Sequence, residues 1–154
     1  MLREYRLPYR EWRRVSRRAY AAQQRDQSEV AGLIAVGRHR EIRLEFVRNE
    51  SDRPCHFEFG WDQFLRARAV IRASGHRYLG MFHSHPISEA IPGRGDLRGA
   101  RVNSVVLIYD VCGTNARLWR IVKLARKKQA IEIPLVIERS PRGRVLSGDF
   151  AHAE

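Results

Sequence analysis

The sequence predicts one α/β domain in which helices pack on a mainly antiparallel or mixed β-sheet. Its 154 residues match the size of a single domain with its own hydrophobic core. Two segments, residues 8–27 and 61–73, repeat apolar residues at helical spacing. Short uncharged or alternating runs, bounded by turn residues, occupy much of the remaining chain and are typical of strands.

The two helical segments each have their own supporting signals. In the second one, Asp62 near the start and Arg72 near the end suit the helix dipole, and Ser74–Gly75 supplies a stop. In the first one, arginines occupy the other sides of the helix, and a single apolar stripe is formed by Trp12, Val15, Ala19 and Ala22.

Seven short strands are expected. The second of them alternates Ile42, Leu44 and Phe46 with charged neighbours, so it should be half buried. A short helix beginning at Asp96 should separate the fourth strand from the fifth. The strands are expected at residues 30–37, 41–47, 55–59, 76–85, 104–111, 116–124 and 130–138.

The polar, turn-rich end of the chain differs in composition from the rest. We expect the folded domain to span residues 1–138 and a flexible C-terminal tail to span residues 139–154. Trp12, Trp61 and Trp119 are expected to be core anchors.

The chain is strongly basic, with 29 Lys and Arg against 17 Asp and Glu and a net charge of +12. Such a field favours nucleic acids, acidic proteins or anionic surfaces as partners. The basic residues are spread along the chain without a run of five like charges. This spacing favours a solvated basic surface over a dedicated nucleic-acid tail.

The two cysteines and the hydropathy pattern exclude several classes of protein. Cys55 and Cys112 lie 57 positions apart without CxxC spacing, so neither a disulfide framework nor a zinc finger is indicated. The longest stretch without Asp, Glu, Lys or Arg is far shorter than the roughly 20 apolar residues of a membrane helix. Charged residues interrupt the N-terminal segment, unlike a secretory signal. We expect a cytoplasmic protein.

The residues with the clearest chemical meaning are His83-Ser84-His85-Pro86 and Asp96. Residues i and i+2 of a strand point to one face, so the two imidazoles would lie side by side, and the following loop could bring the carboxylate to them. Two imidazoles and one carboxylate form a three-ligand set for zinc. The alternative is a pair of histidines hydrogen-bonded at a structural turn. His39, His56 and His76 show no ligand spacing with this group.

A general base for such a site would be Glu29, at the head of the uncharged segment VAGLIAVG. The alternative is a water-exposed junction residue. Together these elements resemble the motif of the JAMM (JAB1/MPN/Mov34) metalloprotease family. In that motif a Glu near the first strand precedes H-S-H-P, a Ser and an Asp, and Gly93 stands here at the place of the Ser. The resemblance extends over residues 10–125 and indicates the small, stand-alone prokaryotic type.

The resemblance implies a single MPN/JAB-like domain, similar to cytidine deaminases, with a curved mixed sheet flanked by helices. It also implies that His83, His85 and Asp96 ligate zinc, and that Glu29 holds the attacking water and shuttles its proton. The family's Ser helps to stabilise the tetrahedral intermediate, so Gly93 should slow the reaction. Ser88, or a backbone N–H in the loop 93–95, is a candidate substitute.

The implied function is that of a zinc-dependent isopeptidase or peptidase that cleaves after the C-terminal glycine tail of a ubiquitin-like or sulfur carrier protein. A +12 surface would favour an acidic carrier. One alternative is an MPN-type binding or scaffold module with impaired catalysis. Another is a RadC-like protein associated with nucleic acid, although those proteins resemble HNHPSG where this chain has HSHPIS. We expect neither nucleic acid nor a membrane as the partner.

Overall fold

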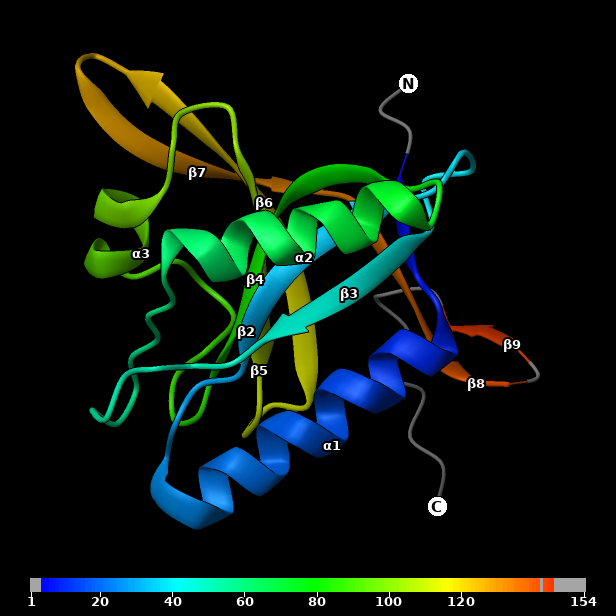
Figure 1. The fold of residues 1–154 in the computed structure, drawn as a ribbon, viewed down its shortest axis with the longest axis horizontal. Helices are drawn as coiled ribbons and strands as arrows, with labels where there is room; N and C mark the ends of the chain where they lie inside the picture. The colour runs from blue at the N-terminus through cyan, green and yellow to red at the C-terminus, as the bar shows by residue number, and fades with distance from the viewer. Residues whose placement is uncertain (1–3, 142, 146–154) are drawn as a thin grey trace.

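The fold is described from a computed structural model that covers residues 4–141 and 143–145. These residues form three helices and nine strands, arranged as a six-stranded sheet and a three-stranded sheet (Figure 1). In spatial order, the large sheet consists of β3 (Ile42–Val47), β2 (Ala31–Val36), β4 (Arg77–His85), β5 (Val105–Asp110), β6 (Asn115–Leu124) and β7 (Lys127–Ile133).

The large sheet is mixed. Strands β4 and β5 are parallel, and every other neighbouring pair is antiparallel. The parallel pair needs a crossover connection, which is the segment that holds the short helix α3 (Arg94–Gly99). The predicted mixed α/β sheet is confirmed.

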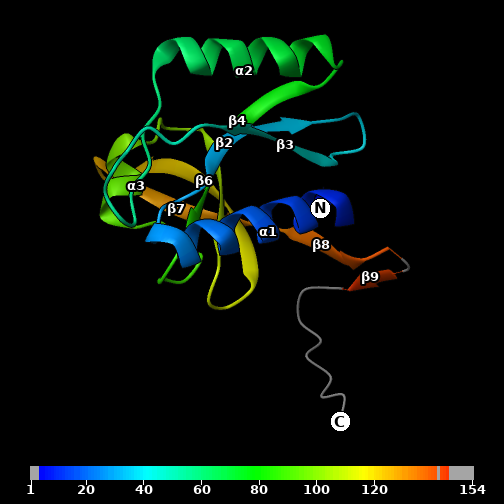
Figure 2. The ribbon, with the colours of Figure 1, turned by 60° about the horizontal axis from the view of Figure 1, so that its bottom comes forward.

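The two long helices cover opposite faces of the large sheet, as Figure 2 shows. The alternation of side chains in β2 explains this arrangement. Leu33 and Ala35 face α2 (Trp61–Ala73), whereas Ile34 and Val36 belong to the core on the side of α1 (Tyr9–Asp26). All six residues of β2 are buried, as expected for a central strand with helices on both faces.

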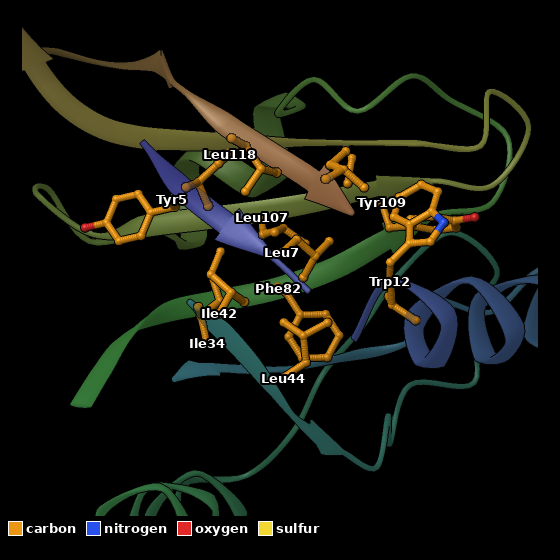
Figure 3. Close-up of a cluster of buried hydrophobic side chains, with 14 of the residues drawn as sticks. Tyr5, Leu7, Trp12, Ile34, Ile42, Leu44, Phe82, Leu107, Tyr109 and Leu118 are labelled. Carbon is orange, nitrogen blue, oxygen red and sulfur yellow. The ribbon is translucent and has the colours of Figure 1, made fainter. Parts of the chain in front are cut away.

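The larger core lies between the six-stranded sheet, α1 and the small sheet (Figure 3). The small sheet has the order β1 (Tyr5–Leu7), β8 (Leu135–Ser140) and β9 (Gly143–Val145). Trp12 of α1 packs edge-on against Tyr109 of β5, with ring centroids 5.3 Å apart, while Leu7 and Phe82 are fully buried. The predicted apolar stripe of α1 is confirmed, because Trp12, Val15, Ala19 and Ala22 are all buried.

The C-terminal part differs from the sequence prediction. A single strand was expected at 130–138, but the chain leaves β7 at Pro134 and enters the other sheet as β8. Proline has no N–H for a ladder, and the carbonyl of Pro134 accepts a hydrogen bond from the Tyr5 N–H instead. The expected boundary at residue 138 falls inside β8. Of the expected tail, residues 142 and 146–154 lie outside the described residues, so the division into domain and tail stays a prediction.

Two further expectations are wrong. The segment 55–59 is a loop rather than a strand, and Cys55 there adopts a positive φ of 54°. Trp61 is 63% exposed rather than a core anchor, whereas Trp12 and Trp119 are buried as predicted.

None of the helices in the described residues has the length and hydrophobicity that a membrane-spanning helix needs.

Candidate functional site

Strand β4 presents the two histidines of the motif on one face. His83 and His85 follow Met81 on the side of the sheet that carries α2, whereas Phe82 points into the core beneath α1. Ser84 points the other way, and its hydroxyl accepts a hydrogen bond from the Val30 N–H at 2.9 Å.

The register of β2 and β4 brings Glu29 beside the histidines. Ala31 lies opposite His83, so the antiparallel register continued by two residues sets Glu29 opposite His85. The Ser84 N–H donates to the Val30 carbonyl at 2.9 Å, which maintains this pairing just before β2 begins. The Glu29 residue is only 6% exposed. The alternative of a water-exposed junction residue is therefore wrong.

Asp96 reaches the histidines because the loop after β4 packs back on the sheet. Ala90 in this loop belongs to a buried cluster with Ile108 and Trp119, and Leu97 of α3 packs against the same cluster. The indole N–H of Trp119 donates to the Ala90 carbonyl at 2.8 Å. The loop and α3 are thus fixed to β5 and β6, with Asp96 in the first turn of the helix.

The three side chains meet in a compact triangle. The His83 Nε2 atom lies 3.2 Å from His85 Nε2 and 3.1 Å from Asp96 Oδ1, and His85 Nε2 lies 3.2 Å from Asp96 Oδ2. Ligand atoms that surround zinc tetrahedrally at its usual bond lengths lie about 3.3 Å apart. These residues therefore form a candidate metal site whose spacing fits a tetrahedral ion with one position left open.

The pKa values of the two carboxyl groups in the site, Asp96 and Glu29, are shifted in opposite directions. Burial would raise the pKa of Asp96, but hydrogen bonds from His83 and His85 outweigh it and hold the pKa far below its ordinary value. Burial raises the pKa of Glu29, and the nearby histidines offset this only in part. Asp96 is thus an ionised candidate ligand, whereas Glu29 has the greater proton affinity that a general base needs.

The two histidines are oriented by different means. The Nδ1 atom of His85 is 2.7 Å from the Glu89 carbonyl oxygen, which leaves Nε2 as the candidate ligand atom. The Nδ1 atom of His83 is buried and has no hydrogen-bond partner within the described chain. The ring of Phe57 stacks on the His83 imidazole, with the ring centroids 4.7 Å apart and an angle of 25° between the ring planes. Packing therefore holds the His83 imidazole in place of a hydrogen bond.

The side chain of Asn49 organises the segment that carries Phe57. Its amide donates to the carbonyl oxygens of Glu29 and His56, both at 2.9 Å. Its oxygen accepts from the N–H groups of Ser51 and Glu58. The sequence predicted a strand at 55–59 instead of this loop, because a loop held by one amide has no periodicity.

A cavity of about 530 Å³ surrounds the triangle and Glu29. His56 also lines this cavity, although its sequence position gave no ligand spacing. The Gly93 N–H is already donated to Asp96 Oδ2 at 2.8 Å, so it is not a free donor. Ser88 carries a hydroxyl group into the same lining.

Comparison with known proteins identifies the family. Residues 13–122 match the model of prokaryotic homologs of the JAB domain. The chain is 29% identical over 111 residues to a desampylase of Pyrococcus furiosus, a match that covers 71% of this chain and 76% of that protein. Among solved structures, a protein of Desulfitobacterium hafniense has a TM-score of 0.62 at 20% identity, with 96% of this chain and 99% of that chain covered.

A second solved structure, a JAB1/MPN domain protein of Archaeoglobus fulgidus, has a TM-score of 0.51 at 17% identity, with 86% and 98% of the two chains covered. These likenesses support the fold, and the family match spans both Glu29 and the His-Ser-His-Pro segment. The chain belongs to the prokaryotic homologs of the JAB domain, a family of JAMM metalloprotease type.

Proposed function

We propose that the protein is a zinc-dependent isopeptidase or peptidase that cleaves after the C-terminal glycine tail of a ubiquitin-like or sulfur carrier protein. The observation that carries this proposal is the triangle of His83, His85 and Asp96 ligand atoms at 3.1–3.2 Å, with the buried carboxyl group of Glu29 beside it. A purely structural turn does not require a third ligand and a buried carboxyl group at one open cavity.

The residues of the chain divide the chemistry between them. Zinc held by His83, His85 and Asp96 would polarise the scissile carbonyl group and lower the pKa of a water molecule. Glu29 accepts the proton of the attacking water and returns it to the leaving amine. Burial raises the pKa of Glu29, which favours its uptake of a proton.

The cavity suits a tail without side chains. Three of its lining residues are glycines, Gly93, Gly95 and Gly99, which leaves room for a substrate backbone beside Asp96. An extended Gly-Gly segment fits such a wall more closely than a bulkier segment. The similarity to a desampylase of Pyrococcus furiosus supports a protein-deconjugating role.

The test is cleavage of a ubiquitin-like protein with a C-terminal extension, followed by intact mass measurement of the products. We expect cleavage after the Gly-Gly pair, loss of activity with a chelator, recovery with one equivalent of zinc, and much slower cleavage when Val-Val replaces Gly-Gly. One zinc per chain without cleavage of any such substrate would favour the binding-module alternative. A zinc content near zero would contradict the proposed metal site itself.

A further inference from the structure

A second recess lies next to the metal cavity. It has a volume of about 500 Å³ and is formed by the C-terminal half of α1, the end of β3 and the segment 48–51. Glu29 lines both hollows. The side chain of Gln23 in α1 also donates to the carbonyl of Pro86, directly after the metal-binding strand, at 2.6 Å. The recess and the metal cavity are therefore neighbouring parts of one surface.

Three arginines, Arg18, Arg25 and Arg48, line this recess, which we call the arginine recess. All three residues are exposed. In the described part of the chain, neither Arg18 nor Arg48 has an ion-pair partner, whereas Arg25 contacts Asp26 at 3.3 Å. Helix α1 adds to the field, because it carries six arginines against two acidic residues.

One of these guanidinium groups is pre-oriented by aromatic packing. The guanidinium carbon of Arg18 lies 4.2 Å from the centroid of the Phe46 ring, and that of Arg14 lies 4.9 Å from it. A planar guanidinium held in this way loses less side-chain freedom when it binds a carboxylate by two parallel hydrogen bonds.

The recess suits an acidic side chain better than a nucleic acid. Phe46 is the aromatic residue of its lining, and two arginines and Phe82 already pack against that ring, which leaves less of it for base stacking. Asp26 and Glu29 also line the recess. A polyphosphate backbone would bring closely spaced charges toward these carboxyl groups, whereas a single carboxylate can sit among the arginines alone.

We propose that the arginine recess docks an Asp or Glu side chain on the folded body of the protein whose C-terminal tail enters the metal cavity. This inference rests on the proposed function and adds the charge of the substrate to it. An acidic patch near the base of the tail would engage the recess while the tail passes Glu29. Because the three arginines are exposed, their removal should change the association rate and the salt dependence of binding. Charges at the rim of an interface act mainly on the encounter of the two proteins.

The experiment measures binding rather than cleavage, so that it does not depend on catalysis. The probes are ubiquitin with a C-terminal extension and a variant of it whose surface lysines are replaced by glutamate. Both are titrated into the zinc-loaded Glu29→Gln protein at about 0.05 M and 0.3 M salt. The recess variant carries Arg18→Gln, Arg25→Gln and Arg48→Gln. The matched control removes an equal number of positive charges elsewhere, at Arg72, Arg77 and Arg120, which lie outside both hollows.

We expect the acidic probe to bind more tightly than ubiquitin, and the recess variant to weaken its Kd about tenfold at low salt, from three exposed pairs of modest strength. The control variant should weaken it about twofold, through the overall field alone. Equal loss in the two variants would overturn the docking site. Tighter recess-dependent binding of a single-stranded oligonucleotide than of the acidic probe would also overturn it.

The two proposals fail in different ways. Recess-dependent binding of the acidic probe, together with no cleavage by the wild-type protein, would support the docking site and refute the proposed activity. Cleavage by the wild-type protein with the same KM in the recess and control variants would support the activity and refute the docking site. Zinc content and Tm measured on each variant show whether a loss of binding reflects misfolding.

Discussion

The side-chain amide of Asn49 donates a hydrogen bond to the backbone carbonyl of Glu29 at 2.9 Å. The same amide binds His56, Ser51 and Glu58 in the loop that forms one wall of the metal cavity. All of its hydrogen-bonding capacity is therefore used, and the proposed general base and the cavity wall form one connected unit.

Asn49→Ala is expected to reduce turnover more than metal binding. The substitution leaves backbone groups at Glu29 and in the loop without partners, which should lower the free energy of unfolding by about 1–3 kcal/mol. The three candidate metal ligands lie on β4 and α3 and keep their own supports. Unfolding by urea, zinc content and kcat are compared with those of Gln129→Ala on the exposed face of β7. Wild-type kcat in the Asn49 variant would contradict the positioning role.

Trp119→Phe is expected to weaken metal binding. It removes the indole N–H that binds the Ala90 carbonyl and leaves that buried oxygen unpaired, at a cost of about 1–3 kcal/mol. Because this contact fixes the loop that leads to Asp96, zinc should dissociate more readily. The same replacement at the exposed Trp61 is the control and should change stability by less than about 0.5 kcal/mol. Competition with a chromophoric chelator measures the affinity, and equal values in the two variants would refute the link.

Gly93→Ser is expected to increase kcat. The backbone of Gly93 has a φ of −78°, and an added Cβ would lie 3.7 Å from Asp96 Oδ2, so a side chain fits without strain. A hydroxyl group there supplies an oxyanion donor, and such donors elsewhere contribute on the order of 10² to 10³ in turnover. Gly93→Ala is the matched control, since it adds the Cβ alone. If serine and alanine gave the same kcat with zinc bound, position 93 would have no role in transition-state stabilisation.

The ion pair between Arg117 of β6 and Glu132 of β7 predicts a specific pH dependence of stability. Hydrogen bonds from Arg117 lower the pKa of Glu132, so this pair stabilises the fold above the ordinary glutamate range and stops doing so as pH falls through the lowered folded-state pKa. Glu132 is 48% exposed, so Glu132→Gln should lower the free energy of unfolding by only about 0.5 kcal/mol at pH 7. The difference from wild type should vanish in acid. A difference that persists at the lowest pH where the protein stays folded would refute this assignment.

The sequence predicted those features that depend on local periodicity. The stripe of α1 and the i, i+2 histidines of β4 follow from 3.6-residue and 2-residue repeats, and both are present in the structure. The meeting of Glu29 with His85 could not be derived from such patterns. It depends on the register between β2 and β4, and the sequence supplied it only through resemblance to a family.

Features that depend on single contacts were not predicted from the sequence. Three residues of β1 are too few to show a period, and the split at Pro134 depends on pairing with a distant strand. The stacking of Phe57 on His83 arises inside a loop that Asn49 holds, so no pattern of spacing indicated it. Trp61 was predicted wrongly for a different reason. As a large apolar residue it was expected in the hydrophobic core, but it is exposed to solvent.

The most direct test of the proposed site compares the cleavage rates of wild-type protein and Glu29→Gln, each with its zinc content measured. Gln has nearly the shape of Glu but cannot accept the proton of the attacking water. We predict one zinc per chain in both proteins and a loss of kcat of at least about 10², within the range that a positioned general base contributes. Cleavage by Glu29→Gln at the wild-type rate, with zinc bound, would contradict the account.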